Sequence, residues 1–285
     1  GGRWRHGWSE EAPSVPVSMS AMPFYRRSRS FGPLPTVGPA PQSANASVLH
    51  SAATPASQPA DPCEVGYAVV DLETTGLSPA TDAILEIGLV LTAPDGTPQR
   101  TWSTLINPGA GPDGAIEVGP TFIHGLLPDD LAGAPSLDDV ADLLVRDLAG
   151  RVVVAHNARF DVGFLTQALG TRGHLARGAR VPRVCTMEWA RHFITTPSRR
   201  LTTCCEVAGV EIGRHHSALD DAEAAAGLLR HYMAVGRQRG EEPLAWSRTL
   251  ADAAAFRGWS WDDAAARAQE QRLTRRPGPG VPRAH

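Results

Sequence analysis

Residues 66–76 have the sequence Gly66-Tyr-Ala-Val-Val-Asp71-Leu-Glu73-Thr-Thr-Gly76, an apolar run that leads into two acidic residues and a turn. The apolar run predicts a buried strand. Because side chains alternate between the two faces of a strand, Asp71 and Glu73 at its end point to the same face. Two carboxylates side by side repel each other unless a cation neutralises them. The pair therefore indicates a metal site, with a solvated strand end as the alternative.

The sequence around this strand predicts an α/β fold. Strands are expected at 84–92, 101–106, 151–155 and 181–185, with Asp95-Gly96 as a hairpin turn between the first two. Helices are expected at 136–149, 158–169, 187–193, 201–208 and 218–235, the first of them capped by Ser136. Strands that alternate with helices after an opening meander predict three layers, with a mixed central sheet flanked by helices.

Composition divides the chain into three parts. Residues 1–62 are rich in Pro, Ser, Ala and Gly and are predicted to be a disordered leader. Residues 63–236 contain the predicted folded domain. Residues 237–285 predict one or two Ala-rich helices and then a loose Arg/Pro/Gly-rich end from 275. Four cysteines make a poor disulfide framework, and no apolar run is long enough for a transmembrane helix, so we expect a cytoplasmic protein without a membrane partner.

The charged residues are unusual in kind and in distribution. All 27 basic residues are arginine, which excludes chemistry that needs a Schiff-base lysine or a P-loop lysine. The net charge of the chain is −3, but residues 61–236 hold thirteen Arg against twenty-two acidic residues, a net charge of −9. The flanks, 1–60 and 237–285, carry +3 each. The acidic middle would suit a site that approaches phosphate through metal ions rather than through basic side chains.

A third acidic residue, Asp161, lies in His156-Asn157-Ala-Arg-Phe160-Asp161, directly after the predicted strand at 151–155. A polar pair after an apolar strand, followed by an acidic residue at a helix start, is typical of a site at the edge of a sheet. Taken alone, this segment is explained equally well by helix capping or by a favourable contact with the helix dipole.

A fourth acidic residue, Asp221, lies in His215-His216-Ser217-Ala-Leu-Asp220-Asp221. Ser217 with Asp220 resembles a capping box, so a helix is expected from Ala218. His216 then lies in the loop before the helix and Asp221 on its first turn, so that the two side chains can converge. A surface histidine pair beside a charged helix start is the alternative for this segment alone.

The three segments together resemble the DEDDh family of 3'-5' exonucleases over about residues 64–236. Asp71-x-Glu73, Asn157-x-x-Phe160-Asp161 and His216-x-Ala-Leu-x-Asp221 occur in the family's order and with similar gaps. The proofreading epsilon subunit of bacterial DNA polymerase III is a member. Ile123-His124-Gly125-Leu126 is similar to the family's His-Gly-Ile element, and residues 185–191 look like its Asp-Thr-x-x-x-Ala-Arg helix, with Cys185 in place of the usual Asp. The resemblance implies a ribonuclease H-like fold.

The resemblance also implies a two-metal phosphodiester hydrolysis that releases nucleoside 5'-monophosphates. Asp71 would bridge two Mg²⁺ ions, Glu73 and Asp221 would complete the first, and Asp161 would help to hold the second, with Mn²⁺ as a substitute. His216 would act as general base, a role that the ordinary imidazole pKa of about 6.5 suits. The residues expected to contact the substrate are Thr74, Thr75, Leu77, His124, Asn157 and Phe160.

The expected function is therefore removal of nucleotides from single-stranded or frayed DNA 3' ends, in proofreading or repair, with a DNA polymerase catalytic subunit as a candidate partner. One rival is an RNA-trimming member of the same family, such as ribonuclease T or oligoribonuclease. The Thr74-Thr75-Gly76 sequence favours DNA, because oligoribonucleases usually carry Met-Thr-Gly there. A second rival is a non-catalytic nucleic-acid-binding accessory subunit, and the intact set of four acids and a histidine argues against it.

Overall fold

The computed structural model describes residues 61–213, 216–241 and 243–277, so that nearly all of the predicted leader, His215 and the residues from 278 onwards lie outside it. The strands are β1 (Tyr67–Thr74), β2 (Ile84–Thr92), β3 (Pro98–Leu105), β4 (Val152–Ala155) and β5 (Arg183–Cys185). The helices are η1 (Pro62–Glu64), α1 (Thr121–His124), α2 (Pro128–Ala132), α3 (Ala141–Leu148), α4 (Ala158–Thr171), α5 (Thr186–Phe193), α6 (Leu201–Ala208), α7 (Ala218–Arg239), α8 (Leu244–Ala255), α9 (Asp263–Gln269) and η2 (Glu270–Arg272). No helix in these ranges is both long and apolar enough to cross a membrane.

Within the described residues, the strands form one five-stranded sheet in the order β3-β2-β1-β4-β5. β1 and β2 are antiparallel, as are β2 and β3, whereas β4 is parallel to both β1 and β5. The tight turn between β2 and β3 forms at Asp95-Gly96, where Gly96 has a φ of 85° and its N–H donates to the Ala93 carbonyl at 3.0 Å. Parallel neighbours need longer crossovers, which α3 and α4 supply. The mixed three-layer α/β fold expected from the sequence is confirmed.

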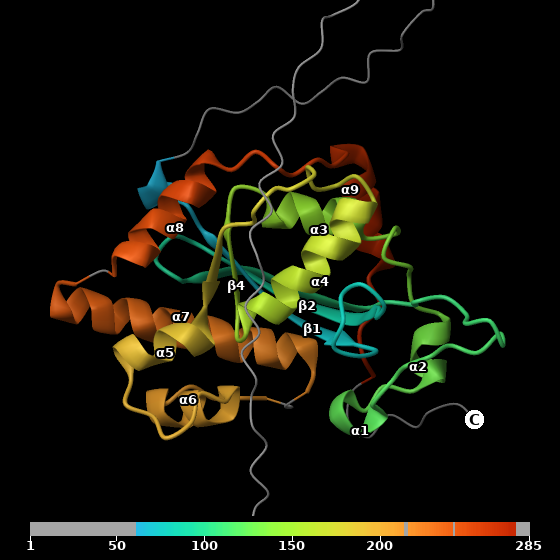
Figure 1. Cartoon of the computed structure of the whole chain (residues 1–285), viewed down its shortest axis with the longest axis horizontal. Coiled ribbons are helices and arrows are strands. Elements are labelled where there is room, and N and C mark those ends of the chain that lie inside the picture. The colour runs from blue at the N-terminus through green and yellow to red at the C-terminus, as the bar shows by residue number, and fades with distance from the viewer. Residues whose placement is uncertain (1–60, 214–215, 242, 278–285) are drawn as a thin grey trace, which may run out of the picture. The chain divides into compact units, whose positions relative to one another are not determined.

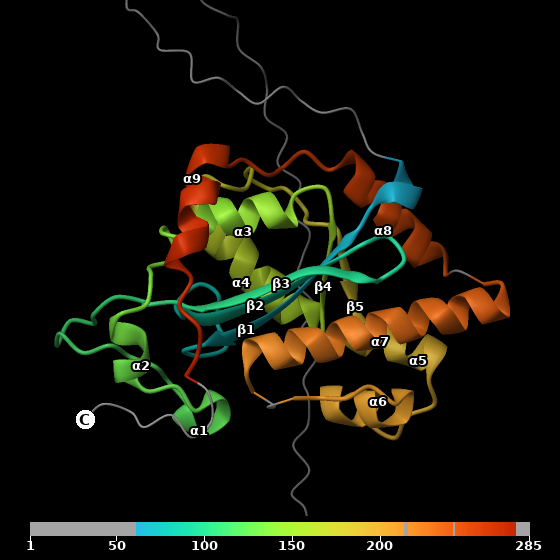
Figure 2. The same cartoon turned by 180° about the vertical axis from the view of Figure 1, so that it is seen from behind.

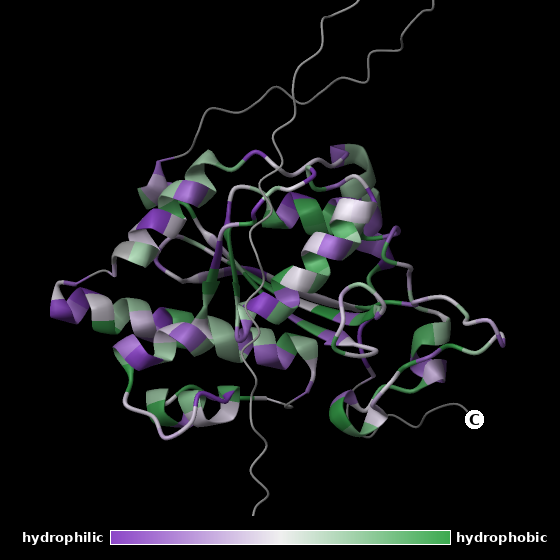
Figure 3. Ribbon diagram, in the orientation of Figure 1, coloured by the Kyte–Doolittle hydropathy of each residue, from purple (hydrophilic) through white to green (hydrophobic). Residues whose placement is uncertain are grey.

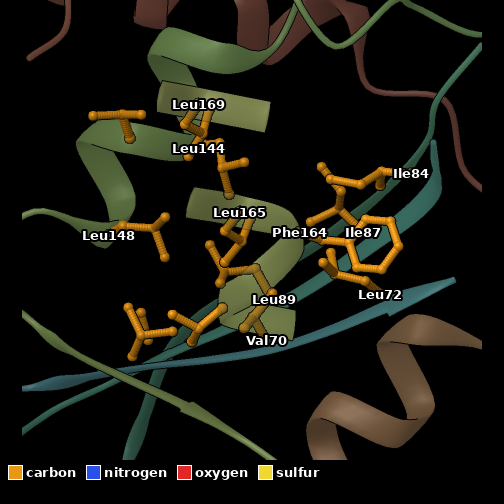
Figure 4. Packing of buried hydrophobic residues seen from close by; sticks show 14 of the residues in the cluster. Val70, Leu72, Ile84, Ile87, Leu89, Leu144, Leu148, Phe164, Leu165 and Leu169 are labelled. Atoms are coloured by element: carbon orange, nitrogen blue, oxygen red, sulfur yellow. The ribbon is translucent and has the colours of Figure 1, made fainter. Parts of the chain in front are cut away.

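Helices cover both faces of the sheet (Figures 1 and 2). On one face, Val70 and Leu72 of β1 belong to a cluster with buried residues of α3 and α4, among them Phe164 (Figure 4). On the other face, Tyr67 and Val69 of β1 belong to a cluster with residues of α7 and α8. Because β1 is buried on both faces, its sequence is continuously apolar up to Val70, and the neighbouring β2 and β4 are mainly hydrophobic as well (Figure 3).

Helices α8 and α9 are part of the same folded unit, which therefore extends past the boundary proposed at residue 236. Trp246 of α8 contacts Tyr67 of β1, with the ring centroids 6.0 Å apart. Gln269 of α9 accepts a hydrogen bond from the backbone N–H of Leu143 in α3 at 2.9 Å. Glu270, just after α9, forms an ion pair with Arg146 of α3 at 2.7 Å. These contacts fix the last described residues of the chain against the layer formed by α3.

Most predicted elements agree with the structure. β2 and α6 have the predicted bounds, and α7 begins at the predicted Ala218. β1 is longer than predicted, because its pairing with β2 continues to Thr74 through an irregularity between Glu73 and Thr74. Asp71 and Glu73, predicted at the end of the strand, therefore both lie within it.

The helix expected from residue 136 begins only at Ala141. Ser136 does make a capping contact, since its Oγ donates to the Asp139 carboxylate at 2.6 Å and accepts from the Asp139 N–H at 3.3 Å. This contact closes a turn over residues 137–140 instead of starting the helix directly. Leu137 and Val140 are nevertheless buried, as their spacing predicts.

Gly88 of β2 allows the start of α7 to lie directly against the sheet. A Cβ at this position would lie 2.1 Å from the carbonyl oxygen of Ala218 and 2.5 Å from the amide nitrogen of Leu219. Both atoms are backbone atoms and cannot rotate away. Gly88 is also the register partner of Asp71 on β1. The glycine therefore fixes how closely the start of α7 approaches the acidic part of β1.

We expect Gly88→Ala to lower the free energy of unfolding by about 1–3 kcal/mol, as other overpacking substitutions do, because the first turn of α7 must move. Gly133→Ala is the matched control, since a Cβ there meets nothing within 4 Å and Gly133 has a φ of −98°. Denaturant titrations of both variants and the wild type measure the difference. Equal stability of the two variants would contradict the close approach.

Candidate active site

Strand β1 places two carboxylates on the face of the sheet that α7 covers. Asp71 and Glu73 have the same strand parity as Tyr67 and Val69, which pack in the cluster that contains α7 residues. Glu73 is buried and Asp71 is half-buried. The strand therefore points both carboxylates toward the start of α7.

Helix α4 contributes Asp161 from its first turn. Asn157, which precedes this helix, has a φ of 87°, a left-handed conformation that Asn tolerates better than most residues. This turn carries the chain from the end of β4 into α4. Asp161 is only 3% exposed, and its charge acts on Asp71. The third predicted acid thus lies beside the β1 pair.

The start of α7 contributes Asp221 and His216. Asp221 is buried in the first turn, and the exposed His216 lies in the loop before it. The His216 N–H donates to Asp221 Oδ2 at 3.1 Å, and His216 has a φ of 64°. A non-glycine residue in this region is strained, and such strain clusters at functional sites. Ligand atoms of Glu73, His216 and Asp221 lie within 4.8 Å of one another, close enough to hold one metal ion.

Burial and mutual repulsion raise the pKa values of three of the acids. Burial, followed by the charges of Asp161, Asp221, Glu73 and Glu86, raises the pKa of Asp71 well above its ordinary value. Burial and the charge of Glu86 raise the pKa of Glu73 to about 7. Burial, with a smaller contribution from Glu73, raises the pKa of Asp161 to about 8. A site of this kind disfavours its own ionised form unless a cation is bound.

The start of α7 is not capped by the predicted capping box. Ser217 is the N-cap residue, but its side chain makes no capping hydrogen bond. Instead, the Ala218 N–H donates to Glu86 Oε2 of β2 at 3.3 Å. A carboxylate at a helix N-terminus is favourably placed with respect to the helix dipole. The cap therefore comes from a strand distant in the sequence, which local patterns cannot reveal.

Glu86 and Arg276 are charged residues of this region that the motifs did not identify. Glu86 is 1% exposed and opposes Glu73 in the β1–β2 register. Arg276 donates to Glu86 Oε2 through Nε at 3.0 Å and also pairs with it through Nη2. A lone acidic residue in the apolar run at 84–91 was a signal for Glu86. Arg276 had no such signal, because its segment has the composition of a loose end.

The end of β1 and the turn after it contain three of the predicted substrate contacts. Thr74 Oγ1 donates to the Gly76 carbonyl at 2.6 Å, and Thr75 Oγ1 accepts from the Ala83 N–H at 2.9 Å. Both hydroxyls thus stabilise the turn. The side chain of Leu77 is exposed to solvent, at 84%.

His124 is buried, and both of its ring nitrogens are bonded to backbone groups. Nδ1 accepts from the Leu126 N–H at 3.0 Å, and Nε2 lies 3.0 Å from the Val118 carbonyl oxygen. Because Nδ1 is an acceptor, Nε2 carries the proton and donates to Val118. In this conformation His124 shapes the loop over 118–126 rather than presenting a ring nitrogen to a substrate.

Exposed apolar side chains lie in two segments near the acidic residues. Leu77 is in the turn after β1, and Phe122 and Ile123 are in α1. We call these three residues the apolar rim. The two segments are in contact, since a Cβ at Gly119 would lie 2.0 Å from the Thr75 carbonyl oxygen.

The last two predicted substrate contacts lie around the start of α4. Asn157 is exposed, whereas Phe160 is half-buried with its ring centroid 5.0 Å from that of Phe164. Phe160 therefore contributes to the core as well as to the surface near the site.

Residues 68–229 match the RNase_T family, which is described as exonuclease. The chain is 32% identical over 165 residues to the PolC-type DNA polymerase III of Clostridium perfringens, covering 58% of this chain and 11% of that protein. It is 33% identical over 178 residues to the PolC-type DNA polymerase III of Bacillus subtilis, covering 62% of this chain and 12% of that protein. The chain thus matches a small part of the length of these relatives.

Among solved structures, E. coli exonuclease I in complex with a dT13 oligonucleotide is similar, with a TM-score of 0.52 and 16% identity over 62% of this chain and 43% of that chain. The zinc-bound form of the E. coli exonuclease I complex with single-stranded DNA gives a TM-score of 0.52 and 17% identity over 62% of this chain and 41% of that one. At this identity the likeness shows a shared fold, which is ribonuclease H-like. The family match spans more than half of the chain and contains Asp71, Glu73, Asp161, His216 and Asp221, so the chain belongs to the exonuclease family.

Proposed function

We propose that this chain is a metal-dependent 3'-5' exonuclease that removes nucleotides from single-stranded or frayed DNA ends. The observation that supports this proposal most strongly is the convergence of Glu73, Asp221 and His216 within 4.8 Å, with the charges of Asp71 and Asp161 alongside. Membership of the exonuclease family supports hydrolysis of phosphodiester bonds. Release of nucleoside 5'-monophosphates from the 3' end is part of the proposal.

The four acidic residues Asp71, Glu73, Asp161 and Asp221 would hold two divalent cations. Carboxylate oxygens suit Mg²⁺ or Mn²⁺, and such cations would favour the ionised form that burial and like charges disfavour when they raise the pKa values of Asp71, Glu73 and Asp161. When bound, the cations supply positive charge at the attacking and leaving oxygens of a phosphodiester. Asp71 would be shared by both, because its carboxylate interacts with those of the other three residues.

His216 would take the proton from the attacking water. It is exposed, and its backbone N–H is bonded to Asp221, so the imidazole is held beside the acidic residues. General bases act over hydrogen-bond distances, which this placement permits. The water oxygen would then attack phosphorus, the bond from phosphorus to the 3' oxygen would break, and that oxygen would take a proton from solvent.

The apolar rim would bind the bases at the end of the strand. Stacking and apolar contact bind every base, and so permit removal of nucleotides of any sequence. DNA is the proposed substrate because the relatives are DNA polymerases, the similar exonuclease I binds dT13, and the turn has the sequence Thr74-Thr75-Gly76. A DNA polymerase catalytic subunit is the proposed partner, in proofreading or repair.

We expect Asp71→Asn to abolish cleavage of end-labelled DNA, because both cations lose a shared ligand. EDTA should abolish wild-type cleavage in the same way, and Mg²⁺ or Mn²⁺ should restore it. Circular dichroism checks that the variant is folded, and an RNA oligonucleotide of the same sequence tests the choice of substrate. Appreciable activity of the variant, or of the wild type in EDTA, would exclude the two-metal mechanism, and faster cleavage of RNA would exclude the DNA preference.

The stability of the metal-free protein should fall as the pH rises. Asp161, with a pKa of about 8 in the folded state, holds a proton there that the unfolded chain loses near pH 4. The folded state therefore binds more protons throughout this window, and its stability decreases by up to about 1.4 kcal/mol per pH unit. Asp161→Asn removes this contribution.

Urea titrations in EDTA between pH 5 and 8 measure this effect. The stability advantage of Asp161→Asn over the wild type should grow with pH, because the Asn side chain carries no charge. The exposed Asp252→Asn serves as the matched control for the loss of one surface carboxylate. A constant advantage of Asp161→Asn across the range would contradict the raised pKa.

The two adjacent histidines should differ in their contribution to the rate. The spacing of the third motif selects His216, whereas His215 lies outside the described residues. We expect His216→Ala to reduce kcat by about 10²–10⁴-fold, as loss of a general base does, and His215→Ala by less than about tenfold. Single-turnover assays at saturating Mg²⁺ measure both. If His215→Ala loses more activity than His216→Ala, then His215 is the histidine of the third motif. If both variants remain active, neither histidine is the general base.

A further inference from the structure

Arg276 connects three elements around the proposed active site. Its Nε and Nη2 groups bond to the carboxylate of Glu86 on β2, and its Nη1 group donates to the carbonyl oxygen of His124 at the end of α1. Glu86 in turn accepts the N–H of Ala218 at the start of α7. The Arg276 side chain is only 10% exposed. A single guanidinium thus links β2, the start of α7 and α1, which carries two of the three residues of the apolar rim.

The segment before Arg276 is itself fixed to the sheet. The Leu105 N–H at the end of β3 donates to the Thr274 carbonyl at 2.7 Å, and the Thr274 N–H donates to Thr104 Oγ1 at 3.0 Å. Leu273 packs against the core cluster that contains α3 and α4. Figure 2 shows this segment, in red, running from α9 past the ends of β2 and β3 to α1. Arg276 is therefore delivered to the site by defined contacts, from beyond the part of the chain that matches the family.

The ion pair with Arg276 gives Glu86 a cationic partner that is part of the protein. Glu86 opposes Glu73 in the sheet register, and its charge raises the pKa of Glu73, whereas Arg276 lowers it. Without the guanidinium, Glu86 would be a buried carboxylate that has lost its cationic partner, next to the proposed metal ligands. Such a group gains most by binding a cation, because an unpaired buried charge is costly.

We propose that Arg276 is a positioning residue of the exonuclease site, which holds Glu86 as the cap of α7 and keeps it out of the cation-binding set. This inference rests on the proposed function. The site then offers four carboxylates to cations, and the fifth fixes the helix that carries Asp221. Loss of Arg276 would convert Glu86 into a competing ligand and would loosen the start of α7.

Kinetics and Mg²⁺ binding of the full chain test this role. We expect Arg276→Ala to lower kcat about tenfold or more, because the catalytic geometry shifts. The same variant should also lower the dissociation constant for Mg²⁺, measured by calorimetry in the absence of DNA, by about threefold or more, since a positive charge has been removed beside the cations. The neighbouring exposed Arg275→Ala is the matched control and should leave both values unchanged.

A second substitution tests whether Glu86 transmits the effect. Glu86→Gln keeps an oxygen to accept the Ala218 N–H but has no charge, so Arg276→Ala combined with Glu86→Gln should recover kcat and the dissociation constant for Mg²⁺ toward the wild type. Arg276→Lys should restore the dissociation constant for Mg²⁺, because the positive charge returns. If Arg276 only stabilises the fold, Arg276→Ala should be less stable, with a dissociation constant for Mg²⁺ that is unchanged or higher and that Glu86→Gln does not correct. That result would overturn the inference. An inactive wild type would instead refute the proposed function.

Discussion

Electrostatic repulsion among buried carboxylates is the constraint on which the rest of this structure depends. Burial and like charge raise the pKa values of Asp71, Glu73 and Asp161, so these three carboxyl groups ionise less readily in the folded chain than they would in water. A flexible scaffold would relieve this repulsion by moving the groups apart. The acids are held instead by β1 of the sheet and by α4 and α7, which pack on its two faces.

The negative charge of Glu86 is compensated differently from that of the four proposed metal ligands. Glu86 is neutralised inside the protein, by the N-terminal end of α7 and by Arg276. Under the proposed function, the charges of Asp71, Glu73, Asp161 and Asp221 would instead be neutralised by divalent cations. Gly88 makes this arrangement possible, because it lets the first turn of α7 lie close to β2. The Ala218 N–H can then bond to Glu86, and the Asp221 carboxylate can lie near that of Glu73.

The parts of the fold that local sequence determines were predictable, and the parts that distant contacts determine were not. β2 is bounded by polar turns and α7 by a recognisable start, and both begin at the predicted residues. The motifs also identified the acids and the histidine that the structure brings together. The longer β1, the cap of α7 and the pairing of Glu86 with Arg276 depend on partners elsewhere in the sheet or, in the last case, 190 residues away in the chain. Periodicity and capping rules describe neighbours within a few residues and carry no information about such partners.

The same division of charge explains how an acidic protein could act on DNA under the proposed function. Residues 61–236 carry a net charge of −9, so little attraction for phosphates can come from the folded region itself. The cations would supply that attraction only at the scissile bond, and the apolar rim of Leu77, Phe122 and Ile123 would bind bases rather than phosphates. Binding would then be confined to the few nucleotides at the end of the strand, because a duplex does not present its base faces. Under the proposed function, an acidic site with an apolar border would therefore select a frayed end by its chemistry. Arg276 would contribute to it through Glu86 and the His124 carbonyl.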